Sequence, residues 1–188
     1  MHPIQMQAGN RGIGMGYNQF VETFQTVCSE HLKDGRARAF AFVFYDMSHG
    51  VVRDALRQAH GFYRLHEKTG KDVTLFYLHD QAVDAHWRSF NLAFMAALGI
   101  TDQTTTPCMV FFRVSGGNIE DVSIYAIDGE SNNPVLTVAE LEQYVDDAVK
   151  KLNAEGDISA LTSLAAAVVQ LAGLLKFADF VKKISSAA

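Results

Sequence analysis

Positions 39–45 hold AFAFVFY, an unbroken run of apolar and aromatic residues. Such a run, without alternating polar positions, is typical of a strand that is covered on both faces of a sheet. The polar stretch 46–50 follows it directly, and positions 51–66 then carry apolar residues at helical spacing. This part of the chain therefore predicts a buried strand, a short loop and a helix.

The next part of the chain repeats that pattern. Positions 73–78, with the sequence VTLFYL, form a second apolar run. A helix is expected after position 83, because apolar residues there fall on one helical face, namely Trp87, Phe90, Phe94 and Leu98. Strand, helix, strand and helix at these lengths predict a right-handed parallel crossover and therefore an α/β sheet.

The following segments predict an antiparallel addition to this sheet. Two short apolar runs, at 109–114 and 122–127, flank the turn sequence SGGN at 115–118, a composition that favours a hairpin. A helix over 137–152 is expected to open with a capping box formed by Thr137 and Glu140. An earlier helix is expected over 17–33. The complete order is helix, strand, helix, strand, helix, strand, strand, helix.

This order resembles the thioredoxin-like fold, and the local match is best at Gly99-Ile100, Thr106-Pro107 and the strand that starts at Cys108. In thioredoxin-like proteins a Gly-Ile segment leads to a cis-proline before the third central strand. The resemblance implies that Pro107 is cis and lies beside the loop after the first central strand. It also implies a three-layer α/β/α arrangement over residues 17–153, with a central mixed sheet of about four strands.

The sequence departs from the redox-active members of that fold at the loop after the first central strand. Those members have a Cys-x-x-Cys there, at a helix N-terminus that lowers the thiol pKa. This chain has DMSHGVV at 46–52, with no cysteine. Dithiol–disulfide exchange at that position is excluded, because no thiolate is present to attack or to resolve.

Three residues near that loop are weak candidates for another reaction. Ser48 and His49 lie at the predicted helix entrance, although Ser48 can equally serve as the N-cap. Cys108, beside Pro107, can act as a single thiol in glutathione-linked or peroxide chemistry only if it is exposed and has a lowered pKa. A buried strand cysteine is the commoner outcome. Neither a metal nor a cofactor is expected, because His79-Asp80 and His86 lack a recognised ligand spacing.

The last part of the chain is unexpectedly apolar. Positions 158–175 carry no charged residue, and we expect an extra C-terminal helix over 158–185. This helix can pack on its own domain, dock to a partner or a second copy, or lie on a membrane surface. The residues predicted to contribute to docking are Thr106, Pro107, Leu164, Val168, Leu171, Leu175 and Phe177.

The composition limits the function classes. The 188 residues have a net charge of −5, which argues against nucleic acid as a partner, and the two cysteines do not indicate a disulfide framework. Residues 1–16 are expected to be a flexible leader without a secretion signal, so a cytoplasmic location is the default. We predict a non-catalytic, thioredoxin-like binding or assembly protein that docks to a protein partner or to itself. The alternatives are a thiol-dependent enzyme and a peripheral membrane protein.

Overall fold

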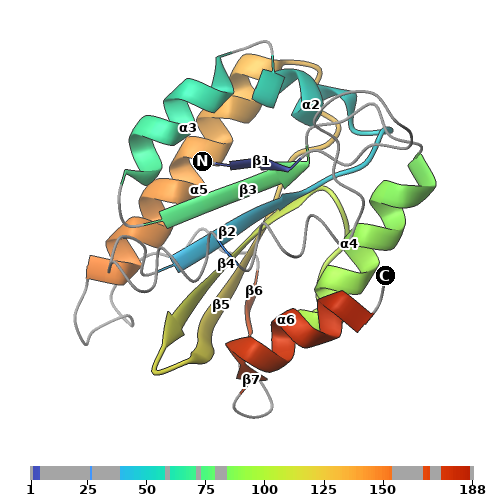
Figure 1. Cartoon of the computed structure of the whole chain (residues 1–188). Coiled ribbons are helices and arrows are strands. Elements are labelled where there is room, and N and C mark those ends of the chain that lie inside the picture. Colours follow the sequence, from blue (N-terminus) through green and yellow to red (C-terminus); the bar gives the residue numbers. More distant parts are fainter. Residues whose placement is uncertain are drawn as a thin grey trace.

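The apolar runs predicted as strands lie in one mixed sheet, with helices on both of its sides (Figure 1). The computed structural model describes residues 2–4, 26, 39–57, 60–70, 73–78, 84–153, 167–169 and 175–186. The helix predicted over 17–33 lies outside these residues, apart from Thr26, which is helical.

The sheet contains seven described strands, which are β1 (His2–Ile4), β2 (Ala39–Phe44), β3 (Val73–Leu78), β4 (Cys108–Ser115), β5 (Asn118–Ala126), β6 (Ala167–Val169) and β7 (Leu175–Lys176). Their order is β1-β3-β2-β4-β5, and both β6 and β7 pair with β5. The first three strands in this order are parallel, and the other pairings are antiparallel. The prediction of about four strands was wrong, because short segments from the two ends of the chain extend the sheet at both edges.

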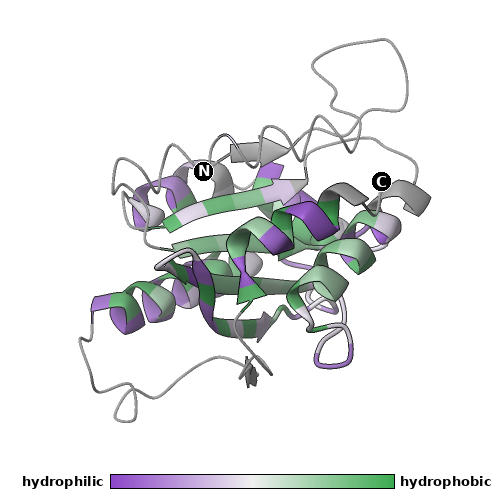
Figure 2. Ribbon diagram, turned by 60° about the horizontal axis from the view of Figure 1, so that its bottom comes forward, coloured by the Kyte–Doolittle hydropathy of each residue, from purple (hydrophilic) through white to green (hydrophobic). Residues whose placement is uncertain are grey.

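The described helices are α2 (Gly50–Arg57), α3 (Gly61–Thr69), α4 (Asp84–Leu98), α5 (Pro134–Asn153) and α6 (Phe177–Ser186). The helices α2, α3 and α5 lie on one side of the sheet, and α4 and α6 lie on the other (Figure 1). Hydrophobic residues follow the strands, whereas hydrophilic residues gather on the outer sides of the helices (Figure 2). The α/β class predicted from the sequence is therefore confirmed.

Strand β2 is buried along its whole length, as predicted. Alternate residues of a strand point to opposite faces, so Phe40, Phe42 and Phe44 share the face that α4 and α6 cover. The ring centroids of Phe42 and Phe94 are 4.1 Å apart, and those of Phe94 and Phe180 are 5.0 Å apart. Such aromatic pairs add about 0.5–1.5 kcal/mol each beyond the burial of their area.

The helix predicted over 51–66 is divided into α2 and α3. His60 has a positive φ of 56°, which a continuous α-helix does not allow. Gly61 follows, and a Cβ atom at this position would lie 2.3 Å from the carbonyl oxygen of Ala55. The two short helices therefore meet closely at a residue without a side chain.

The predicted hairpin is confirmed, with Gly116 and Gly117 both at positive φ (57° and 79°), as a two-residue type I′ turn requires. The predicted start of the next helix was wrong. Helix α5 begins at Pro134, after Asn133, whose side-chain oxygen accepts a 3.0 Å hydrogen bond from the N–H of Val135. The expected capping residue Thr137 instead donates its hydroxyl to the Asn133 carbonyl.

The prediction of one C-terminal helix over 158–185 was also wrong. The chain is a strand at 167–169 and again at 175–176, and of the residues described after 153 the helical ones are Phe177–Ser186. An uncovered edge of β5 would leave backbone groups without partners, and a β-branched pair such as Val168-Val169 suits a strand. Residues 158–166 and 170–174 lie outside the described part.

The two ends of the chain contribute to the same sheet and core. Residues 2–4, assigned from the sequence to a flexible leader, form β1 and pair with β3 in parallel. At the other end, Phe180 and Ile184 of α6 are completely buried in the core. The described part of the C-terminal segment therefore folds back on its own domain, which is one of the three outcomes considered above.

Candidate functional site

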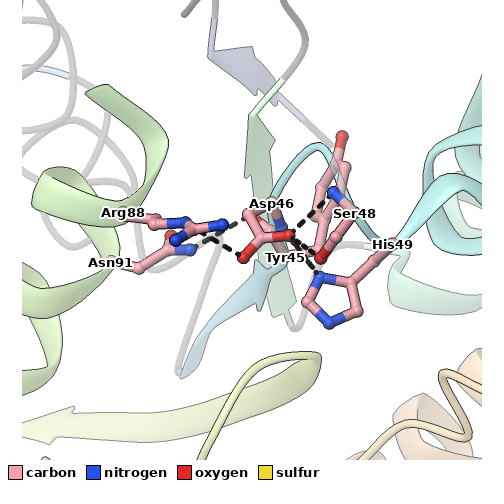
Figure 3. Close-up of polar contacts among 6 residues, drawn as sticks. All are labelled: Tyr45, Asp46, Ser48, His49, Arg88 and Asn91. Carbon is pink, nitrogen blue, oxygen red and sulfur yellow. Dashed lines mark hydrogen bonds and ion pairs between the residues drawn. The ribbon is translucent and has the colours of Figure 1, made fainter. Parts of the chain in front are cut away.

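The candidate site lies where β2 ends and α2 begins, at the carboxyl ends of the parallel strands β2 and β3. Ligand sites of α/β proteins are commonly found at this end of a parallel sheet. Side chains from the loop after β2 and from α4 converge here (Figure 3). Cis-Pro107, before β4, and Gly129, between β5 and α5, also lie next to this loop.

Asp46 is the centre of the site. One oxygen of its carboxylate, Oδ1, accepts a 2.9 Å hydrogen bond from the N–H of Ser48 and a second one from the Ser48 hydroxyl. The backbone N–H of His49 donates to the carbonyl of Asp46 at 3.1 Å. Ser48, predicted as a possible N-cap, therefore donates to Asp46 in the turn that precedes α2.

The imidazole of His49 is held by the same carboxylate. Its Nδ1 lies 2.8 Å from Oδ1 of Asp46 and accepts a 3.2 Å hydrogen bond from the backbone N–H of Asp46. The ring is thus fixed in orientation, with Nε2 as its remaining nitrogen, and its side chain is 17% exposed.

Helix α4 borders Asp46 on the other side. The Nε atom of Arg88 lies 3.8 Å from Oδ2 of Asp46, while the Arg88 side chain is 61% exposed. Asn91 is buried and donates a 3.0 Å hydrogen bond to the carbonyl of Tyr45, which ties α4 to the end of β2. Figure 3 shows Arg88 and Asn91 approaching from one side and Ser48 and His49 from the other.

These contacts determine the charge of Asp46. Burial of the carboxyl opposes ionisation, but the two hydrogen bonds from Ser48 and the charges of His49 and Arg88 outweigh it. The pKa of Asp46 is therefore lowered from its ordinary value. At neutral pH the site contains a carboxylate that is already bound by its neighbours.

Pro107 is cis, as the resemblance implied, and lies next to this loop. A Cβ atom on Gly129 would be 3.1 Å from the ring of Pro107 and 3.5 Å from the ring of His49. Gly129 therefore lies between these two residues and permits the β5–α5 loop to approach both. Thr106 and Pro107 are half-buried. The structure thus brings together His49 and Pro107, two of the candidates predicted from the sequence.

Cys108 does not meet the conditions for a reactive thiol. It is completely buried in β4, and burial raises its pKa to about 11, against a smaller opposite effect of a hydrogen bond with Thr104. A thiol with a raised pKa is rarely ionised near neutral pH and is a poor nucleophile. Cys28 lies outside the described residues.

Of the docking residues predicted in the C-terminal segment, the structure describes Val168, Leu175 and Phe177. Leu175 and Phe177 are half-buried and pack on the core, and the ring of Phe177 stacks on Phe40 at 6.1 Å. Val168 lies in β6 opposite Ser123. Leu164 and Leu171 lie outside the described residues.

The described side chains contain no group of three or more His, Cys, Asp or Glu residues that could hold a metal ion. His79 and Asp80 are outside the described part, and His86 lies in α4. Comparison of the chain with protein-family models, with curated proteins and with solved structures finds no match.

Several residues of the site were not singled out from the sequence. Asp46 had a usable signal, because an aspartate in the polar stretch between a strand and a helix commonly bonds to backbone N–H groups two residues on. Arg88, Asn91 and Gly129 had none, since their roles arise only when α4 and the β5–α5 loop meet the end of β2.

Proposed function

We propose that this chain is a thioredoxin-like protein that binds a partner and carries out no thiol chemistry. The observation that carries the proposal is the pairing of cis-Pro107 with a loop that holds Asp46, Ser48 and His49 in place of a Cys-x-x-Cys. This loop corresponds to the one that carries the two cysteines in redox-active members. Here it carries Asp46, Ser48 and His49, which contact one another through polar groups.

The element order supports the thioredoxin-like part of the proposal. Two parallel strands joined by a crossover, β2 and β3, are followed by α4, by the cis-proline and by the antiparallel pair β4 and β5. The helix α5 then closes the sequence of elements that the resemblance requires. The edge strands β1, β6 and β7 are additions to this arrangement.

The chemistry at the loop supports a role in binding rather than in catalysis. The Asp46 carboxylate accepts hydrogen bonds from Ser48 and contacts His49, so the hydroxyl of Ser48 is a donor to an anion and not an activated nucleophile. The buried thiol of Cys108, with its raised pKa, argues against the alternative of a thiol-dependent enzyme.

We place the partner surface at the loop rim, which we define as Ser48, His49, Thr106, Pro107 and Gly129. This differs from docking through the C-terminal segment, because Leu175 and Phe177 already pack on the core. The start of α5 follows the rim in the chain and presents Val135 and Leu136, which are 57% and 61% exposed. Large apolar side chains at such exposure next to a polar loop are typical of protein-binding surfaces.

The test uses the full chain as bait in affinity purification from its native host, with four variants. We expect Leu136→Asp and His49→Ala to lose the partners that the wild-type chain retains. The matched control is Tyr63→Asp on α3, which alters an equally exposed residue and should retain them. Double replacement of Cys28 and Cys108 by serine should also retain them, and light scattering of the purified chain would identify a second copy as the partner.

Two results would contradict the proposal. Equal recovery of partners by His49→Ala, Leu136→Asp and the control would exclude the loop rim and the start of α5. Loss of binding in the double cysteine variant, with its fold intact, would favour the thiol-dependent alternative.

No helix in the described part of the chain is long and apolar enough to cross a membrane. The cytoplasmic location and the membrane-surface alternative remain predictions, and flotation with liposomes tests the latter.

A further inference from the structure

A second group of polar side chains lies on the face of β2 opposite to the one that carries Phe40, Phe42 and Phe44. Val43 is paired with Tyr77 of β3, and Tyr45 lies two residues after Val43, so the two tyrosines point to the same face. That face is covered by α2, α3 and α5, because Tyr125, which shares it, donates a 2.6 Å hydrogen bond to Asp147 of α5. In Figure 3 the ring of Tyr45 turns away from Arg88 and Asn91.

Arg57, the last residue of α2, is the unusual member of this group. It is half-buried, and its Nε atom is buried without a hydrogen-bond partner among the described residues. No described carboxylate forms an ion pair with it. Arg53, one turn earlier on α2, lies 3.5 Å from Asp54, and both of these side chains are about one-third exposed.

The tyrosines beside Arg57 supply no negative charge. Burial raises the pKa of Tyr77 to about 12 and raises the pKa of Tyr45 further, although the charge of Arg57 opposes the shift in both. Both hydroxyls therefore stay neutral at physiological pH. The described groups around Arg57 thus leave its charge without a counter-charge.

Arg57 is half-buried, with its Nε atom buried, and charges removed in part from water are normally paired in proteins. The planar guanidinium presents its N–H donors in a fork that matches the oxygen atoms of a phosphate group. The position is also favourable, since Tyr45 and Tyr77 lie at the carboxyl ends of parallel strands, where α/β proteins bind ligands. A ligand with two or three negatively charged oxygens would compensate Arg57 and would share Arg53 with Asp54.

We propose that Arg57 and Arg53 form a binding site for a phosphate group, free or as part of a small phosphate monoester. Arg57 is the principal ligand, and Arg53, one turn earlier on α2, adds a second cation. The site lies on the α2 side of the sheet and is independent of the loop rim and of the proposed partner.

The test is titration of the full chain with inorganic phosphate, followed by NMR of the arginine Nε–H signals and by calorimetry. Sodium chloride at the same ionic strength is the reference, because exposed charges respond to salt alone. We expect saturable movement of the Arg57 Nε–H signal. Arg57→Gln should weaken phosphate binding at least 10-fold, and Arg57→Lys should weaken it less. The matched control, Arg64→Gln on α3, should bind phosphate as the wild type does, since Arg64 pairs with Glu142.

A parallel titration with glycerol phosphate distinguishes the two sources of the group. Tighter binding of the monoester indicates a metabolite, and equal or weaker binding indicates free phosphate. The proposal is overturned if the Arg57 signal follows chloride and phosphate equally, or if Arg57→Gln binds phosphate with unchanged affinity. The NMR readout on the wild-type chain keeps the test valid even where Arg57→Gln fails to fold.

Discussion

Asp46 is a single carboxylate whose ionisation links the β2–α2 loop to the stability of the protein. Its burial opposes ionisation, but the bonds from Ser48 and the charges of His49 and Arg88 lower its pKa. A lowered pKa in the folded state contributes stability above the unfolded pKa, and this contribution is lost as the pH falls through the folded value.

We therefore expect Asp46→Asn to be less stable than the wild type at pH 7 by roughly 1–3 kcal/mol, the usual value of a hydrogen bond to a charged group. The difference should shrink as the pH falls below about 4, where the unfolded carboxyl is protonated. Urea unfolding at pH 7 and pH 3 measures it, with Asp54→Asn as a partly exposed control that should change little. A difference that is independent of pH would contradict this account.

The reactivity of the Cys108 thiol is a second property that can be measured at one residue. Burial raises its pKa from 9.0 to about 11, so at pH 8 the folded protein should have about 100-fold less thiolate at this position than an ordinary cysteine. Iodoacetamide should therefore label Cys108 slowly in the native protein and rapidly in urea, as read by peptide mass spectrometry. Rapid labelling of the native protein would reopen the thiol-dependent alternative.

The junction between α2 and α3 depends on one glycine. A Cβ atom on Gly61 would contact the Ala55 carbonyl at 2.3 Å and a methyl group of Val138 at 3.0 Å, so Gly61→Ala must displace the backbone. We expect a loss of about 1–3 kcal/mol in the free energy of unfolding, as for other overpacked cores. Gly50→Ala is the matched control, because its Cβ would meet only ordinary contacts. Chemical denaturation of both variants checks this, and equal stability would contradict it.

The elements could be predicted from the sequence where the local pattern and the final packing agree. The strands at 39–44 and 73–78, the hairpin and α4 have such patterns, and the turn glycines and the apolar runs suffice for them. The break at His60 could not be predicted, because the apolar spacing continues across it.

In the C-terminal segment, by contrast, the local pattern and the final packing disagree. Its alanines and leucines favour a helix by propensity, yet the open edge of β5 supplies partners that make part of it a strand. Likewise, the side chains around Asp46 come from α4 and from the β5–α5 loop, and no spacing in the sequence indicates that these parts meet.

The whole domain depends on its last helix for part of its core. Phe180 is completely buried, and its ring contacts those of Phe94 and Phe112 edge-on. We expect Phe180→Ala to lower the free energy of unfolding by about 3–5 kcal/mol, as for other large core aromatics. The exposed neighbour Lys182→Ala should change it little. Thermal unfolding followed by circular dichroism measures both. A Phe180→Ala protein as stable as the wild type would mean that α6 is dispensable.

The pairing of β6 and β7 with β5 also determines when the edge of β5 is covered during synthesis of the chain. The strand that covers this edge begins about 40 residues after β5 ends, and Phe177, which donates a 2.9 Å hydrogen bond to the Gly117 carbonyl, comes later still. A ribosome adds roughly 5–20 residues per second, so each new chain exposes a bare β5 edge for some seconds. Unpaired edges recruit other strands. Newly made molecules are therefore most prone to aggregate between the synthesis of β5 and that of β6 and β7.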